Sequence, residues 1–197
     1  MTTQSSIKSV GASLVFTPAE ARPKAAATEL LIVPNVGFIA QGSSALTATR
    51  LYYMSFVVRT SITVTQMTIE VTAASGAGTG VMVGIYKADT DWQPTTLELD
   101  GGELLTDAIA VVSVTGLSTV LQPGNYLIAM HAESNPTLRY ARGAAPFINP
   151  VVSATILPSF LYVAKAYAAL SNPGTAWDTP TYATTPLQYY VFLGITP

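Results

Sequence analysis

The residues with the most evident chemical potential are the carboxylates between positions 89 and 103. Asp89 and Asp91 lie in a short polar stretch, and Glu98, Asp100 and Glu103 follow closely. Carboxylate oxygens are ligands that Ca²⁺ prefers, but the spacing fits no EF-hand loop, which needs a glycine and a distal glutamate at fixed positions. We interpret the cluster as a solvated loop in which aspartates form Asx turns, and a calcium site is the alternative.

A single histidine, His131, restricts the catalytic and metal chemistry open to the chain. One histidine without any cysteine cannot build a multi-histidine or thiolate metal site. No serine lies in a Gly-x-Ser-x-Gly turn, and the glycine-rich residues 76–80 lack the Lys-Ser/Thr ending of a phosphate-binding loop. A polysaccharide-degrading β-helix is disfavoured because no repeat of 20–50 residues is present. We therefore predict no enzyme activity and no cofactor, and interpret His131 as a packed or hydrogen-bonded strand residue.

Tryptophan side chains offer a better case for binding. Trp92 is followed by Gln93, and Trp177 by Asp178, in stretches rich in Pro, Gly and Thr that indicate loops. An exposed indole can stack on the apolar face of a sugar while its polar neighbours hold the hydroxyls. These four residues are candidate glycan or host contacts. The competing interpretation is that each tryptophan closes an end of the domain or fills a subunit contact.

A shortage of charge indicates association with other proteins. The chain is 49% hydrophobic and only 10% charged, whereas a soluble domain is about 25% charged. Between residues 143 and 197 the only charged side chains are Lys165 and Asp178. We predict that this neutral stretch forms an oligomer surface, because tyrosine and phenylalanine are enriched at interfaces. The candidate interface residues are Tyr182, Tyr189, Tyr190 and Phe192.

Other partners are excluded by the same composition. The nine lysines and arginines are scattered singly and the net charge is −2, so no basic cluster is available for nucleic acid. No apolar run reaches the 18 residues of a membrane-spanning helix, and no secretory signal follows Met1. We expect a protein made in a cytoplasm, without membrane insertion.

The sequence predicts that the elements positioning these residues are short β-strands. Residues 61–73 alternate apolar and polar side chains with a one-residue slip near Gln66, which predicts a bulged strand. Gly, Pro and Asn turns separate strand-like runs at a spacing typical of a sandwich. We predict an all-β fold, an antiparallel β-sandwich over residues 31–197, with an extended N-terminal arm over residues 1–30, where Pro18 and Pro23 prevent a long helix. Further strands are expected at 30–33, 50–59, 81–87, 103–105, 108–114, 126–132, 137–141 (as an edge strand), 160–168 and 189–195.

Two segments carry a resemblance to a known module. VMVGIYKADTDWQPTTLELDGGEL begins at Val81, and LQPGNYLIAM begins at Leu121. Together they resemble the jelly-roll or carbohydrate-binding-like β-sandwich of tailed-bacteriophage virion proteins, over residues 36–142. In that module a Pro-Gly turn launches a strand whose tyrosine, here Tyr126, faces inward. Trp92 departs from the pattern, because glycine or another small residue is common there.

The resemblance implies a virion protein that forms homotrimers, attaches through its N-terminal segment and often binds host-surface glycan. Our first hypothesis is a trimeric tail-fibre or tail-appendage subunit, joined to other virion proteins through residues 1–30 and contacting the host surface. The alternative is a capsid decoration protein or head fibre that stabilises the phage head.

Overall fold

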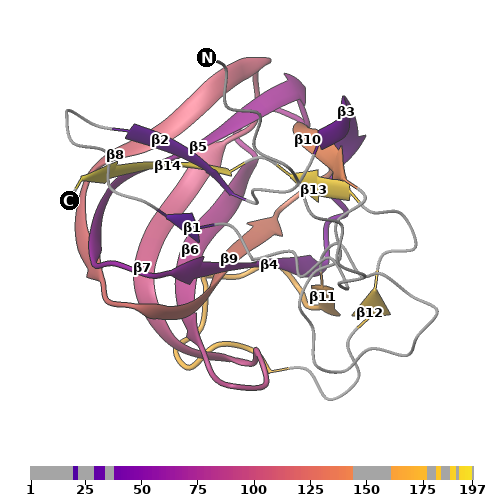
Figure 1. Cartoon of the computed structure of the whole chain (residues 1–197). Helices are drawn as coiled ribbons and strands as arrows, with labels where there is room; N and C mark the ends of the chain where they lie inside the picture. The colour runs from indigo at the N-terminus through magenta and orange to yellow at the C-terminus, as the bar shows by residue number, and fades with distance from the viewer. Residues whose placement is uncertain are drawn as a thin grey trace, which may run out of the picture.

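The computed structural model describes residues 20–21, 29–33, 38–143, 161–176, 181–182, 187–189 and 191–196. Every helix or strand in these ranges is a β-strand, so the predicted all-β class is confirmed. No helix in the described ranges is long and apolar enough to cross a membrane. The strands form two sheets that pack face to face (Figure 1), the sandwich arrangement expected from the alternating patterns.

Sheet A has the strand order β12-β11-β4-β9-β6-β7, and β1 pairs with β4 in parallel. All its other ladders are antiparallel. The strands are β1 (Glu20–Ala21), β4 (Arg50–Val58), β6 (Gly80–Ala88), β7 (Pro94–Leu105), β9 (Gly124–Ala132), β11 (Leu161–Ala164) and β12 (Thr181–Tyr182).

Sheet B is centred on β5, which pairs with β8 on one side and with β14 and β10 on the other. Strand β2 extends the sheet from β14, and β3 and β13 flank β10. The strands are β2 (Glu29–Val33), β3 (Phe38–Ala45), β5 (Ile62–Ala73), β8 (Ala110–Leu121), β10 (Thr137–Gly143), β13 (Leu187–Tyr189) and β14 (Val191–Thr196).

The main core fills the space between the sheets with alternate residues of both. Phe56 of β4, Ile69 of β5 and Ile85 of β6 are fully buried there, as a period of two requires. Tyr126 also faces inward, as expected. It stacks on Phe56 with ring centroids 5.6 Å apart, and its hydroxyl donates to the carbonyl of Gln122 at 2.7 Å. A tyrosine that bonds back to its own turn fixes the corner of a Greek-key sandwich.

The slip predicted near Gln66 is confirmed as a bulge in β5. Val64 and Met67 both face the core, although two residues lie between them and a regular strand would place them on opposite faces. The pairing of β5 with both β8 and β14 shifts between Val64 and Gln66. The bulge therefore keeps both halves of a long strand packed on one core.

Two expectations about the strands need correction or restriction. Residues 137–141 are not an edge strand, because Tyr140 of β10 pairs with Gly42 of β3 on one side and with Tyr189 of β13 on the other. The proposed arm over residues 1–30 lies largely outside the described residues. Its described parts, in β1 and the start of β2, are strands that pair within the sheets.

Candidate functional site

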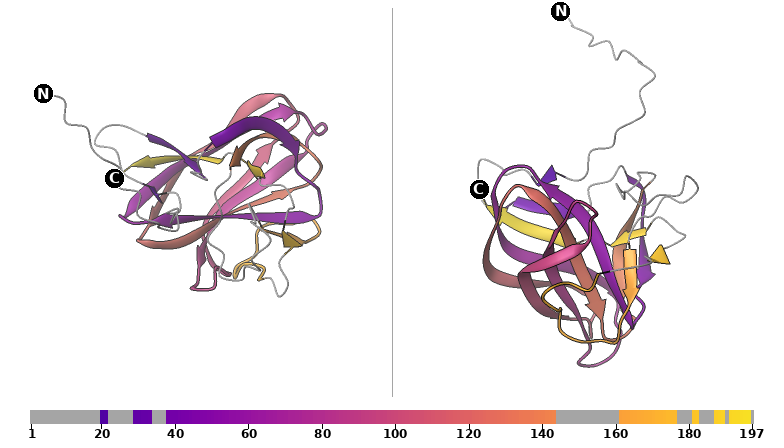
Figure 2. Two further views of the ribbon diagram at one scale, coloured as in Figure 1. Left: turned by 45° about the vertical axis from the view of Figure 1, so that its right-hand side comes forward. Right: turned by 90° about the horizontal axis from the view of Figure 1, so that it is seen from below.

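The outer face of sheet A is covered by residues 165–176, which we call the strap. In Figure 2 this amber segment runs across the outside of the strands. Beneath it lies a second apolar cluster, separate from the main core, in which Leu170 of the strap packs with side chains of β4, β6 and β9 and of the turn after β6. The cluster consists of Leu51, Tyr53, Tyr86, Ala88, Trp92, Leu127, Ala129 and Leu170.

Tyrosine hydroxyls fasten the strap to the sheet. Tyr86 donates to the carbonyl of Ser171 at 2.7 Å, and Tyr53 donates to the carbonyl of Thr175 at 3.3 Å. Burial raises the pKa of Tyr86 to about 12 and also raises the pKa of Tyr53. Both hydroxyls therefore stay protonated as donors at neutral pH. The backbone N–H of Gly174 adds a bond to the carbonyl of Thr95 at 2.8 Å.

The strap approaches the sheet so closely that a glycine is required beneath it. A Cβ on Gly84 would lie 2.5 Å from Cδ1 of Leu170 and 2.8 Å from the carbonyl oxygen of Leu99. The second contact is with backbone, which cannot rotate away. Gly84 therefore creates the depression into which Leu170 packs.

His131 is fully buried below the start of the strap. Its Nε2 lies 3.2 Å from the carbonyl of Lys165, and its Nδ1 lies 3.3 Å from the carbonyl of Ala168. Burial lowers the pKa of His131, the two carbonyls oppose that shift, and the charge of Lys165 reinforces it. The ring is therefore neutral near pH 7 and donates through one nitrogen. Its interpretation as a packed, hydrogen-bonded strand residue is confirmed.

The remaining polar groups near His131 are engaged by the strap itself. Lys165 Nζ donates to Oγ1 of Thr175 at 2.8 Å, and the Tyr167 hydroxyl donates to the carboxylate of Glu103. Burial, followed by that carboxylate, raises the pKa of Tyr167. These contacts close the strap at both ends. They give the buried polar side chains a structural role.

The predicted Asx turns are present at Asp89 and Asp100, but the predicted loop is wrong for Glu98, Asp100 and Glu103, which lie in strand β7. Oδ1 of Asp89 accepts the backbone N–H groups of Asp91 and Gln93 at 2.9 and 2.8 Å. Oδ1 of Asp100 likewise accepts the N–H of Gly102 at 2.9 Å. Among the described residues no three histidine, cysteine, aspartate or glutamate side chains gather so that they could hold a metal ion. Asp89 and Asp100 therefore shape the local backbone, while Glu103 accepts the hydroxyl of Tyr167.

The expectation of an exposed indole at Trp92 was wrong. Trp92 is only 8% exposed and packs in the cluster under the strap. Its φ of 62° lies in the left-handed region, which glycine adopts more readily than tryptophan. Gln93 is half-buried and its N–H bonds Asp89. Trp177 and Asp178 lie outside the described residues.

The candidate oligomer residues divide in a similar way. Tyr189 is 2% exposed, donates to the carbonyl of Ala45 at 2.8 Å and meets the ring of Tyr52 edge-on, so it belongs to the core of its own chain and its assignment to an interface is corrected. Phe192 is half-buried on β14, opposite Thr68 in the register. The side chain of Tyr182 and all of Tyr190 lie outside the described part.

Sequence reasoning missed the most exposed apolar residues. Ile109 is 72% exposed, Val111 68%, Val120 51% and Leu105 50%. Val111 and Val120 belong to β8, whose one strand partner in the described ranges is β5. Leu105 ends β7 and Ile109 precedes β8, and together they form what we call the β7–β8 corner. The signal in the sequence was the absence of any Asp, Glu, Lys or Arg from residue 108 to residue 132.

The β7–β8 corner is rigid because Thr106 is tied into the neighbouring turn. Thr106 is fully buried, its N–H donates to the carbonyl of Thr79 at 2.8 Å, and its carbonyl accepts the N–H of Ser75 at 3.1 Å. Leu105 and Ile109 on either side of it are thus held outward by a fixed backbone. Exposed apolar groups on a rigid support are typical of a docking surface.

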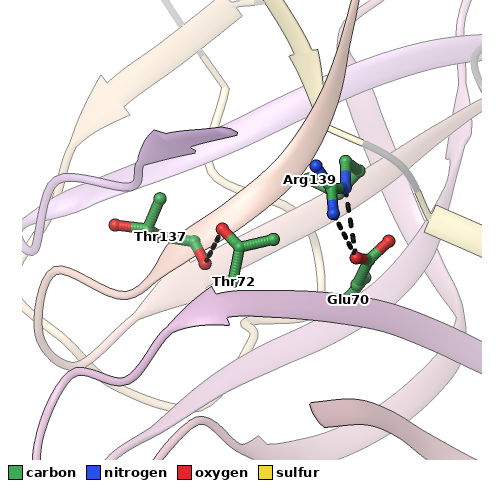
Figure 3. Close-up of polar contacts among 4 residues, drawn as sticks. All are labelled: Glu70, Thr72, Thr137 and Arg139. Carbon is green, nitrogen blue, oxygen red and sulfur yellow. Dashed lines mark hydrogen bonds and ion pairs between the residues drawn. The ribbon is translucent and has the colours of Figure 1, made fainter. Parts of the chain in front are cut away.

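Away from β8, the described side chains on the outer face of sheet B include several polar pairs. Arg139 of β10 donates to Oε1 of Glu70 on β5 at 2.7 Å, and Thr72 donates to the carbonyl of Thr137 at 3.1 Å (Figure 3). Closer to the edge, Thr68 and Ser113 join their hydroxyls at 2.7 Å. Among the described residues of this sheet, the exposed large apolar side chains lie on β8.

No family model, curated protein or solved structure matches this chain. The strap-covered face and the β8 edge with its corner are the features from which a function can be inferred. Of the two, the edge and the corner present side chains that another molecule can contact.

Proposed function

We propose that this protein is a non-enzymatic structural subunit of a tailed-bacteriophage virion. In this proposal it is a trimeric tail-fibre or tail-appendage subunit, attached to the particle through residues 1–30 and contacting the host surface. The sequence resemblance supplies the class of particle. The inward Tyr126 after its Pro-Gly turn is consistent with that resemblance.

The observation that carries the proposal is the β7–β8 corner. Leu105 and Ile109 are at least half exposed on a backbone that Thr106 holds fixed. Leaving large apolar side chains in water is unfavourable by roughly 25 cal/mol per Å² relative to burying them. On a chain with so little charge, such a corner favours a partner protein over permanent exposure.

Immunogold labelling of virions of the phage that encodes the chain tests the assignment. We expect gold at the tail, and removal of residues 1–19, which leaves β1 and β2 intact, should prevent incorporation. Gold on the head would instead identify the alternative, a capsid decoration protein or head fibre. Intact virions without any gold would contradict both.

The role of the corner can be tested separately. Ile109→Lys should reduce incorporation into particles at least tenfold, because a charge replaces an apolar contact. Thr96→Lys is the matched control, since Thr96 is also exposed and lies on β7 away from the corner. Equal incorporation of both variants would remove the corner from the attachment surface.

A further inference from the structure

We propose that β8 pairs antiparallel with β8 of a second copy of this chain, about a two-fold axis between residues 115 and 116. This contact joins sheet B of one copy to sheet B of the other. It does not depend on the proposed virion function. It is an alternative to the three-copy assembly that the resemblance implies, because a two-fold contact relates two copies only. The mass of the purified chain decides between them, since the trimer would contain three chains.

The first argument is that no described strand pairs with the outer side of β8, and that the sequence of β8 does not protect this edge. Natural edge strands carry charges or prolines that prevent pairing with other chains. Strand β7, at the edge of sheet A, follows this rule with Glu98, Asp100 and Glu103. Strand β8, at the edge of sheet B, has no charged residue and no proline over its 12 residues. The two edges lie on the same side of the sandwich (left in Figure 1), so the difference is specific to the strand.

The second argument is that β8 is complementary to itself. When two copies run antiparallel about the proposed axis, each residue faces one whose number brings the sum to 231. Val111 then lies opposite Val120 of the other copy. Ser113 likewise lies opposite Ser118. Such pairs of like β-branched or small hydroxyl residues are favourable across neighbouring strands.

Burial from Val111 to Val120 has the same symmetry. Val112 and Val114 are partly buried towards the core on one side of the axis, and Leu117 and Thr119 on the other, whereas the residues between them are exposed. In an antiparallel pair, the side chains of two directly opposed residues point to the same face of the sheet. Along each strand, the side to which the backbone N–H points alternates from residue to residue, as the side-chain face does. The proposed register therefore places core-facing residues opposite core-facing residues and aligns the backbone groups.

A bulge in the middle of the strand produces this symmetry. Gly116 has a φ of 75°, and the pairing with β5 shifts between the partners Thr115 and Thr119. Without the slip, Leu117 would face outward and the two halves of β8 would not match. A bulge can also protect an edge by twisting it away from a partner, and the experiments below separate these two roles.

The mass of the purified full-length chain gives the first test. We expect particles that contain twice the 20.7 kDa of one chain, by analytical ultracentrifugation. Val111→Lys with Val120→Lys should raise the dissociation constant at least a hundredfold, because lysines then face each other twice. Thr96→Lys, at an exposed position of β7 away from both the corner and β8, is the control and should leave the mass unchanged.

A charge swap tests the register. Val111→Lys combined with Val120→Glu should restore the two-copy particle, because each lysine then faces a glutamate of the other copy. Within one chain these positions are roughly 30 Å apart along the strand and cannot pair. Restoration thus reports a contact between copies, and both double variants should retain the wild-type circular dichroism spectrum.

Cross-linking provides a measurement independent of stability. The chain has no cysteine, so Ser113→Cys and Ser118→Cys can be made in separate chains and mixed under mild oxidation. We expect a disulfide in the mixture and none in either variant alone, because residues directly opposite each other lie within disulfide reach. A monomeric wild type, or a mass that the lysine pair does not change, would overturn the proposal.

Discussion

The outer face of sheet A and the edge strand of sheet B are both apolar and nearly free of charge, but only one of them is covered. The strap closes the first with Leu170 and with bonds from Tyr53 and Tyr86. Nothing in the described residues closes the second, where Val111 and Val120 stay more than half exposed. A lack of charge therefore has two different causes in one molecule.

The comparison changes how the neutral stretch after residue 143 is understood. Its described parts pack on their own chain, the strap on sheet A and β14 within sheet B. Lysines and glutamates would be costly in either position. Internal packing thus explains the lack of charge at the buried positions of these described parts, and the proposed contact between copies lies earlier, in β8.

Truncating one side chain on each surface should give the largest difference in the free energy of unfolding. Leu170→Ala removes a buried side chain from between the strap and the sheet, and should lower the free energy of unfolding by about 2–4 kcal/mol. Val111→Ala should change it by less than about 0.5 kcal/mol in the monomer, because the valine is exposed. Urea denaturation of both variants at low protein concentration measures the difference. Equal losses would mean that the strap adds little to stability.

Removal of a single hydroxyl should have a smaller effect. Tyr86→Phe leaves the carbonyl of Ser171 without its donor at 2.7 Å, and should destabilise the chain by about 1–2 kcal/mol. Hydrogen exchange should then accelerate in residues 165–176 more than in β5. Uniform acceleration across the chain would show that the strap does not open as a separate unit.

The pH dependence tests the same cover through His131. Because burial holds the pKa of His131 below its ordinary value, the unfolded chain binds a proton that the folded chain does not. Stability should therefore fall as the pH drops below the unfolded value of about 6.5. His131→Gln should flatten the fall between about pH 7 and pH 5 in thermal melts. An unchanged slope would indicate that other groups produce it.

Local sequence patterns predict much of the fold. The alternation in residues 61–73 predicts β5 together with its bulge, because both the period of two and the one-residue slip can be seen in neighbouring residues of the sequence. The Asx turn at Asp89 is equally local. Strand β7 was underestimated, because its glycines and acids in residues 94–105 interrupt the pattern while its ladder with β6 sustains the strand.

The features that depend on distant contacts could not be predicted in this way. Nothing periodic marks residues 165–176 as a cover for sheet A, since the strap is held by side chains of β4 and β6. Trp92 was assigned to an exposed loop because its neighbours are polar, but its left-handed backbone and the strap bury it. Edge status is likewise non-local, because it depends on which strands remain unpaired. This is why the sequence wrongly predicts an edge strand at residues 137–141.

The smallest effect on stability is expected on the outer face of sheet B, at the ion pair of Glu70 with Arg139. Both side chains are about one-third exposed, at 32% and 35%, so water screens their attraction. Glu70→Gln should therefore cost no more than about 0.5 kcal/mol, and the difference from wild type should shrink further as salt rises to about 1 M. Urea denaturation at low and high salt measures both. A loss as large as that of Tyr86→Phe would mean that the open face of sheet B is held as firmly as the strap-covered face. The contrast between the two surfaces would then lie in their apolar residues alone.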